Sequence, residues 1–255
     1  MRKLFFAILT LFTLAIFSGC TSSSSQQGQF VKSIFQTNGA SSIVKHTSSL
    51  TKSLLKYSSK LNKRNPSYYS KKYAQIIKQD IKKNVNTIRL PLIKNSSNSY
   101  EEYLTIAFSK NYVKNRNDYL ILGIYKMLYF TYDRDRGHTV TTMQYEIEKL
   151  QEANKLLQVI RYKINNAKDK NGNYLFITWQ RKWQIDLLKN INSSKKMTKL
   201  SLNKKNTKLL LERSNMSYQV ILSDMIFTVQ KSIIVLGGEV NNLGAQTIKT
   251  FIFFI

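Results

Sequence analysis

Cysteine, histidine, proline and glycine are all scarce in this sequence. The 255 residues include one cysteine, two histidines, two prolines and nine glycines. A disulfide needs two cysteines and a structural zinc site usually needs several Cys or His ligands, so neither is expected within one chain. Strict apolar–polar alternation is scarce as well, whereas apolar residues recur at helical spacing. The sequence therefore predicts an all-α protein.

The one cysteine, Cys20, follows a segment with the three-part layout of a secretory signal. Arg2 and Lys3 supply positive charge, the next fourteen residues read "LFFAILTLFTLAIF", and the small residues "SG" come last. The apolar run is shorter than the roughly 18 residues of a membrane-spanning helix. We expect residues 1–19 to be a signal peptide.

The sequence "FSGC" at positions 17–20 resembles the lipobox of bacterial lipoproteins, with Phe17 standing where that class usually has leucine. The resemblance implies that the Cys20 thiol receives diacylglycerol and that cleavage just before it makes the acylated cysteine the mature N-terminus. In Gram-negative lipoproteins an aspartate after the cysteine often means retention in the inner membrane. Thr21 stands there, which implies the outer membrane, facing the periplasm. An ordinary cleaved signal and an uncleaved N-terminal anchor are the alternatives.

Residues 20–38 are predicted to form a flexible tether. The stretch "TSSSSQQGQ" after the cysteine is rich in Ser and Gln and poor in apolar residues, so it cannot form a core. One acyl chain holds a protein to a bilayer only marginally, whereas two hold it stably. Since the lipobox resemblance implies at least two chains on Cys20, we expect a protein that is tethered to a membrane and does not span it.

Acidic residues are few, with 14 Asp and Glu against 40 Lys and Arg, so the formal net charge is +26. Such an excess raises nucleic acid as a partner. An exported chain rarely meets nucleic acid, and the lysines are spread along the sequence, so we do not expect that partner. Lipopolysaccharide, anionic phospholipid and peptidoglycan are the anionic partners that an envelope offers. A solvated surface without a partner is the simpler alternative.

Helical spacing continues through most of the remaining chain, and we predict an α-helical domain over residues 39–238. The expected helices cover 41–61, 66–85, 99–107, 119–132, 141–166, 174–191 and 216–236. The expected N-caps are Asn65 before Pro66, Ser99, Asn117 or Asp118, and Thr141.

About seven helices joined by short loops favour antiparallel neighbours, so we predict a compact multi-helix bundle. A TPR-like helical solenoid is the alternative, although no fixed repeat period recurs along the chain. The helix at 119–132 is apolar nearly all round apart from Lys126, which predicts that it lies at the centre of the domain.

The densest charged stretch is "DRDRGH" at 133–138. Asp133, Asp135 and His138 could bind a metal or perform acid–base chemistry. A calcium loop fails on spacing, because Gln144 stands at the twelfth position and Gly137 is misplaced. We expect an alternating-charge turn, in which each arginine neutralises an aspartate, and no metal site.

One aromatic face falls in the helix predicted over 174–191. If exposed, it could stack on sugars or anchor a partner protein. The alternative is a core stripe of the bundle. Its members, with the two basic residues beside them, are Phe176, Trp179, Trp183, Arg181 and Lys182.

A basic, polar stretch precedes the last helix and could touch anionic headgroups or glycan, with a solvated loop as the alternative. Its lysines are Lys195, Lys196, Lys199, Lys204, Lys205 and Lys208. The C-terminal tail, 239–255, ends "TFIFFI" and is too apolar to be left in water. We expect it to pack on the bundle, and a partner's groove is the alternative.

Motifs for catalysis are missing: the sequence contains no Ser-His-Asp order, phosphate-binding loop, nucleotide fingerprint or metal-spaced histidines. We therefore expect no enzyme and no cofactor. The sequence predicts a lipid-anchored envelope protein with a structural, assembly or interaction role, whose partner is another envelope protein. A binder of anionic envelope polymer, peptidoglycan or lipopolysaccharide, is the alternative. A hydrolase using Asp133, Asp135 or His138 is a distant third.

Overall fold

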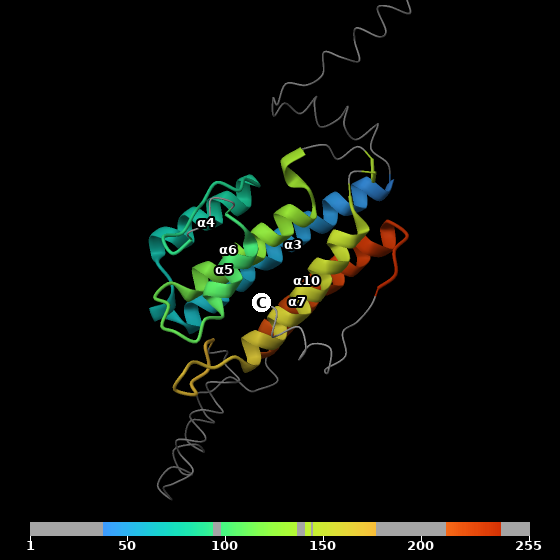
Figure 1. Cartoon of the computed structure of the whole chain (residues 1–255). Coiled ribbons are helices and arrows are strands. Elements are labelled where there is room, and N and C mark those ends of the chain that lie inside the picture. Colours follow the sequence, from blue (N-terminus) through green and yellow to red (C-terminus); the bar gives the residue numbers. More distant parts are fainter. Residues whose placement is uncertain (1–37, 94–97, 137–140, 144, 177–212, 241–255) are drawn as a thin grey trace, which may run out of the picture. The chain divides into compact units, whose positions relative to one another are not determined.

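The computed structural model describes residues 38–93, 98–136, 141–143, 145–176 and 213–240, all within the unit Thr37–Ile255 (Figure 1). These ranges contain six α-helices, and their β-pairing is limited to one isolated bridge between Lys168 and Tyr174. Across the same ranges, no helix combines the length and the hydropathy that crossing a bilayer requires. The prediction of an all-α fold is confirmed.

Helix α3 (Asn38–Arg64) contains the predicted segment 41–61 and buries its apolar stripe. It ends at Asn65, whose backbone N–H and side-chain amide both donate to the Leu61 carbonyl, at 2.9 and 3.1 Å. The prediction that Asn65 caps the following helix is therefore wrong, because its side chain is already bonded to the helix before it. Pro66 comes next and cannot continue α3, since it has no N–H.

Helix α4 (Lys71–Lys83) begins five residues later than predicted. The intervening residues Pro66–Tyr68 form a 3₁₀ turn, η1. Ser70 is the N-cap, and its hydroxyl oxygen accepts a long hydrogen bond from the Tyr73 N–H at 3.5 Å. Asn84 ends the helix in the left-handed conformation, with φ 56°. A short amide side chain tolerates that conformation better than most residues do.

Helices α5 (Tyr100–Ala107) and α6 (Arg116–Thr131) pack against each other at a small-residue contact. A Cβ on Gly123 of α6 would lie 2.9 Å from Cδ2 of Leu104 on α5. The glycine therefore allows a close approach of the two helices. Ser99 occupies the N-cap position of α5 as predicted, but its side chain makes no capping hydrogen bond.

Asn117 and Asp118 were both predicted to cap α6, and neither does. Asn115 holds that position, and the two predicted caps lie buried in the first turn of the helix. The Asp118 carboxylate accepts a hydrogen bond from the Ser70 N–H at 2.8 Å, and the Asn117 amide donates to the Asn65 carbonyl at 3.3 Å. Their side chains therefore join α6 to the connection between α3 and α4.

The last two described helices are α7 (Ile147–Asn166) and α10 (Arg213–Val235). The predicted cap Thr141 is wrong, since α7 begins six residues later, although it ends where predicted. Beyond α10, Gly237 adopts φ 79° and donates its N–H to the Ile234 carbonyl at 2.9 Å. This left-handed glycine is the predicted stop signal.

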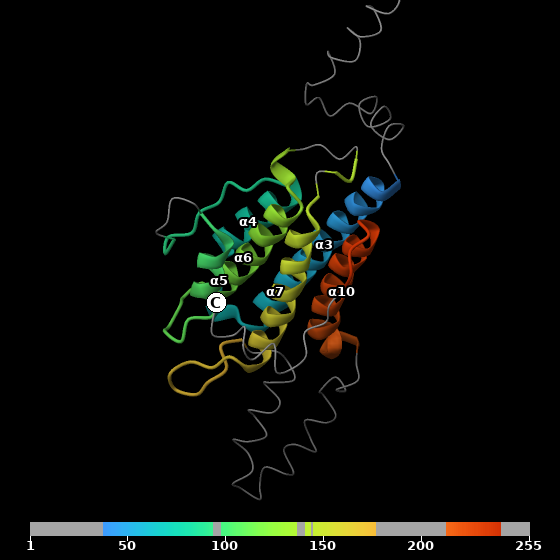
Figure 2. The same cartoon turned by 45° about the vertical axis from the view of Figure 1, so that its right-hand side comes forward.

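Four helices form a ring around the core. Helix α3 contacts α10, α10 contacts α7, α7 contacts α6, and α6 contacts α3, while α4 and α5 lie against α6 (Figures 1 and 2). The first and last described helices, α3 and α10, thus pack on one another. In a solenoid each repeat contacts only its neighbours in sequence. The fold is a bundle, not a TPR-like solenoid.

The helix predicted over 174–191 does not begin at Tyr174. Tyr174 pairs with Lys168 in the isolated bridge, and the Leu175 N–H donates to the Ala167 carbonyl at 3.0 Å. The chain therefore reverses through the predicted turn at 169–173. The rest of that predicted helix, and the tail at 241–255, lie outside the described residues.

Candidate binding site and surfaces

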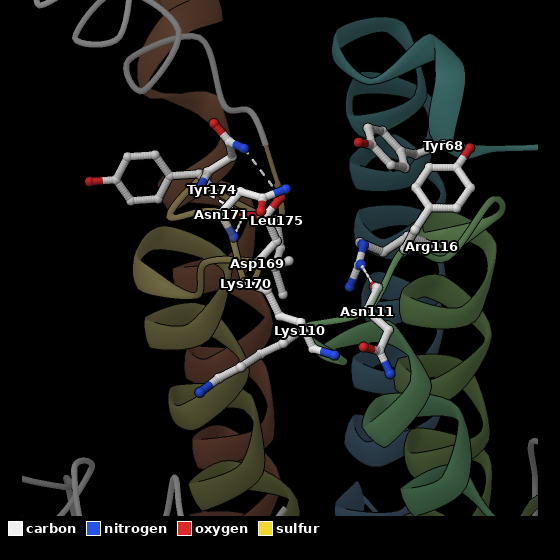
Figure 3. Close-up of a pocket in the computed structure, with 11 residues that line it drawn as sticks. Tyr68, Lys110, Asn111, Arg116, Asp169, Lys170, Asn171, Tyr174 and Leu175 are labelled. Atoms are coloured by element: carbon white, nitrogen blue, oxygen red, sulfur yellow. Dashed lines mark hydrogen bonds between the residues drawn. The ribbon is translucent and has the colours of Figure 1, made fainter.

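A cleft of about 520 Å³ lies where three separated segments meet at one end of the bundle (Figure 3). Tyr68 of η1 lines one side, together with residues 110–112 and Arg116 from the start of α6. The turn that follows α7, within 169–175, lines the other side. No part of this site is local in the sequence.

Arg116 holds the floor of the cleft together. It is 2 % exposed, and its guanidinium donates to the carbonyls of Ala107, Ser109 and Asn111 at 2.6, 2.8 and 2.7 Å. Burial lowers the pKa of Arg116, while the neighbouring Tyr68 and Asp169 act in the opposite direction. Because both terminal nitrogens bond the backbone, this cation fixes the connection between α5 and α6.

The carboxylate of Asp169 is bonded within its own turn. It accepts from the N–H groups of Asn171 and Asn173, both at 2.8 Å, and from the Asn173 amide at 3.3 Å. The hydrogen bond from the Asn173 backbone is the main reason that the pKa of Asp169 is lowered. This group is therefore held ionised and does not face a second carboxyl that could share a proton with it in an acid–base pair.

Aromatic rings and amino groups form the accessible part of the cleft. The rings of Tyr68 and Tyr112 have their centroids 6.2 Å apart, and Tyr112 is 74 % exposed. Lys110 and Lys170 are exposed as well, and Figure 3 shows Tyr68 across the cleft from Asn171. Tyrosine offers an apolar ring with a polar end, which suits a ligand that is both flat and polar.

Only one member of the predicted aromatic face is described. Phe176 is fully buried, and its ring packs edge-on against Phe108 with centroids 5.6 Å apart. Phe176 is therefore a core residue and not part of an exposed face. The remaining members of that face, the predicted lysine cluster and the predicted lipidation site lie outside the described residues: Trp179, Arg181, Lys182, Trp183, Lys195, Lys196, Lys199, Lys204, Lys205, Lys208 and Cys20.

The described part of the charged stretch 133–138 fastens the end of α6 to its neighbours. Arg134 donates to the side-chain oxygen of Asn84 at 2.6 Å and to the Thr47 carbonyl at 3.4 Å. The Tyr129 hydroxyl donates to Asp135 at 2.9 Å. Gly137 and His138 lie outside the described residues. In the ranges that are described, no three His, Cys, Asp or Glu side chains stand close enough together to hold a metal ion.

A buried hydroxyl network, which sequence reasoning missed, joins α3, α6 and α10. The Oγ of Ser232 lies 3.0 Å from His46 Nδ1 and 2.9 Å from the Tyr132 hydroxyl. Burial, followed by the nearby Lys231, lowers the pKa of His46. Ser232 is fully buried, so no substrate could reach this Ser–His pair. The network is structural, and its partners are 100 and 186 residues apart in the sequence.

The outer face of α3 carries cations and hydroxyls only. The helix has no acidic residue among its 27, and apart from Asn38 every exposed position is a lysine or a serine. The spacing of the lysines, seven, four and seven residues, places them within about 40° of one another around the helix. We name this set the α3 lysine row: Lys45, Lys52, Lys56 and Lys63.

The outer face of α10 carries an exposed apolar stripe. Val220, Phe227 and Ile234 are 48, 55 and 62 % exposed and follow one another at intervals of seven residues. The amino group of Lys231 lies 4.4 Å from the centre of the Phe227 ring. We name the three apolar residues the α10 apolar row. The heptad spacing of both rows is visible in the sequence, although sequence reasoning did not single them out.

No protein-family model, curated protein or solved structure matches this chain.

Proposed function

We propose that this chain is a lipid-anchored, non-catalytic protein of the bacterial envelope with a structural, assembly or interaction role. The observation that carries the proposal is Cys20, which directly follows a short apolar run and the residues "SG". Thr21 after the cysteine favours the outer membrane, with the helical bundle facing the periplasm. The partner is another envelope protein, held against the bundle while the tether spans the distance to the bilayer.

The bonding of the charged side chains favours binding over catalysis. Arg116, Arg134 and Asp169 are each hydrogen-bonded to groups of the fold. A general acid or base must instead have its proton within reach of a substrate. The Ser–His pair of the core is closed to substrates as well, because Ser232 is fully buried. These groups stabilise the bundle, which leaves its surface to meet a partner.

The first experiment compares the natural chain with Cys20→Ser in a bacterial host. We expect the natural chain in the membrane fraction, with an intact mass raised by diacylglycerol and lowered by removal of residues 1–19. The Cys20→Ser chain should carry no lipid and leave the membrane fraction when the ionic strength is raised. Two soluble, unmodified forms would overturn the lipid anchor. Capture of a protein partner that resists high salt would support the interaction role, because salt weakens exposed charge contacts.

A second candidate function is binding of anionic envelope polymer, either peptidoglycan or lipopolysaccharide. The cleft favours it, since Tyr68 and Tyr112 offer ring faces beside the amino groups of Lys110 and Lys170. We expect Tyr112→Ala to weaken retention on isolated peptidoglycan or on lipopolysaccharide. Phe130→Ala removes an aromatic ring that is 53 % exposed outside the cleft and is the matched control. Equal retention of both variants would remove the cleft from this function.

A further inference from the structure

We infer that the outer face formed by the α3 lysine row and the α10 apolar row docks on a bilayer surface that contains anionic phospholipid. The inference rests on the proposed function in one respect: the lipid anchor would bring this face to the bilayer. The face itself is built only from described residues, and its binding can be measured without the anchor.

The first argument is the unbalanced charge of α3. Lys52 and Lys56 are four residues apart, and like charges at that spacing destabilise a helix. No acidic residue of α3 offsets them, since the helix contains none. From Lys45 to Lys63 there are 18 residues, so the row is about 27 Å long at 1.5 Å per residue. This length is several times the Debye length of about 8 Å in physiological salt, so an extended anionic surface suits the row better than a single small anion.

The second argument is that the two rows border the same groove between helices. Counted at 100° per residue from the buried Leu50, His46 lies about 40° to one side and the α3 lysine row about 120–160° to that same side. His46 contacts Ser232 of α10, whereas Thr47, on the opposite flank, bonds Arg134 at the end of α6. The lysine row is therefore on the α10 flank of α3. Figure 2 shows the two helices side by side.

On α10, Lys231 joins the two rows. It acts on His46 of α3, and its amino group lies over the Phe227 ring of the apolar row. Interfacial binding of a helix depends on buried apolar area together with electrostatic attraction to anionic lipid. This face presents both, with amino groups at the level of the phosphates and Phe227 able to enter the headgroup layer. A plain polyanion would leave the apolar row without a role.

A second copy of the chain is a poorer occupant of this face. In a two-fold dimer the same patch meets itself. Two α3 lysine rows would then face one another, and the eight like charges would oppose the contact. An anionic bilayer matches the sign of the row, and the chain offers a route to it. Asn38, where α3 begins, lies 18 residues after Cys20 (38 − 20), a span that an extended chain covers in at most about 60 Å.

The test uses the full chain with Cys20→Ser, so that no lipid is attached. Binding is measured by co-sedimentation with vesicles of phosphatidylcholine alone and with vesicles that also contain phosphatidylglycerol at about 30 %. The first variant changes Lys45, Lys52, Lys56 and Lys63 to Gln. The matched control changes four other exposed lysines at the cleft end of the bundle, Lys110, Lys114, Lys168 and Lys170, to Gln. Both variants lose the same charge.

We expect binding to the anionic vesicles only, and a loss of apparent affinity of at least about tenfold in the α3 variant, since each lysine near an anionic membrane contributes substantially. The control should lose less than about threefold. Phe227→Ser should weaken binding while leaving its salt dependence unchanged. Equal losses in the two lysine variants would overturn the inference, because overall charge alone would then explain binding.

A positional readout accompanies the affinities and does not depend on them. Cys20 is the only cysteine, so the Cys20→Ser chain accepts a single new thiol for an environment-sensitive dye. Ser59→Cys places the dye on the outer face of α3, and Asn171→Cys places it in the exposed turn of the cleft. Anionic vesicles should shift the emission of the dye on α3 only.

A shift at the cleft dye alone, no binding of the parent chain to anionic vesicles, or binding to soluble anionic glycan without binding to vesicles would each overturn the inference. The proposed function fails by a different result, namely the absence of a lipid mass on the natural chain. The two failures are therefore separable.

Discussion

Helices α3 and α6 are neighbours in the bundle, and they place their charges on opposite sides. Fifteen of the 16 residues of α6 are buried, including Arg116, Asp118 and Lys126. Six of the 27 residues of α3 are buried, all of them apolar, and its lysines lie outside. Charged groups on α6 therefore hold backbone and loops in place, whereas those on α3 remain available to a partner. The same kind of residue is structural on one helix and functional on the other.

Lys126 shows what a buried charge on α6 does. Its amino group donates to the side-chain oxygen of Asn86 at 2.5 Å and lies 5.2 Å from the centre of the Tyr103 ring. Burial lowers the pKa of Lys126 to about 8, with the nearby Asp80 acting in the opposite direction. In the sequence this lysine only interrupts an apolar helix. In the fold it connects α6 to the loop after α4.

The largest effect should come from Arg116→Met. The substitution leaves the carbonyls of Ala107, Ser109 and Asn111 without this donor, so we expect a loss of about 3–5 kcal/mol in the free energy of unfolding. Urea denaturation followed by circular dichroism measures it. Lys114→Met removes the same charge from an exposed position and is the control. A loss under about 1 kcal/mol for Arg116→Met would break the comparison between the two helices.

A smaller effect, of opposite sign, should come from Asp118→Asn. Burial raises the pKa of Asp118 to about 7, against 3.8 for an ordinary aspartate, and the Ser70 N–H opposes this rise. Since the folded state prefers the protonated carboxyl, the contribution of Asp118 to stability is present below pH 4 and is lost as the pH rises through 7. Asparagine mimics the neutral form and can still accept from Ser70.

We therefore expect the Asp118→Asn chain to be more stable than the natural one at pH 8, by on the order of 2–4 kcal/mol, and equal to it near pH 3. Urea unfolding at several pH values checks both ends of the curve. A constant difference across the pH range would show that the carboxyl stays ionised in the fold.

The smallest effect on stability should come from the α3 lysine row. Changing Lys45, Lys52, Lys56 and Lys63 together to Gln should alter the free energy of unfolding by less than about 1 kcal/mol, because exposed charges contribute little and the repulsion between Lys52 and Lys56 is relieved. The same urea measurement serves. A loss above about 2 kcal/mol would mean that these lysines are structural after all, and that α3 does not differ from α6 in the way described.

The helices with regular apolar spacing were predictable, and the contacts between distant segments were not. Leu50, Leu54 and Leu61 fix α3 because each lies one or two turns from the next. Cap assignments failed where a side chain had two possible partners, as with Asn65, which bonds the helix before it, and Asp118, which bonds the start of α4. Such choices are made by tertiary packing.

The candidate sites divide in the same way. The cleft joins residues near positions 68, 110 and 170, and no local pattern connects them. The α3 lysine row is local, and its spacing of seven, four and seven could have been read from the sequence. It was overlooked because the run of lysines at 195–208 is denser. Periodic placement on one helical face was the more informative signal than density, since it survives folding as a continuous surface.

The pairing of the first described helix with the last has a consequence for the order in which the chain folds. Between the end of α3 and the start of α10 lie 148 residues (213 − 64 − 1), so the ring can close only after nearly the whole chain is present. Contacts between such distant segments slow folding. A chain that crosses a membrane N-terminus first would keep the apolar side of α3 uncovered until α10 emerges, and during that interval it would depend on a chaperone at the far side of the membrane.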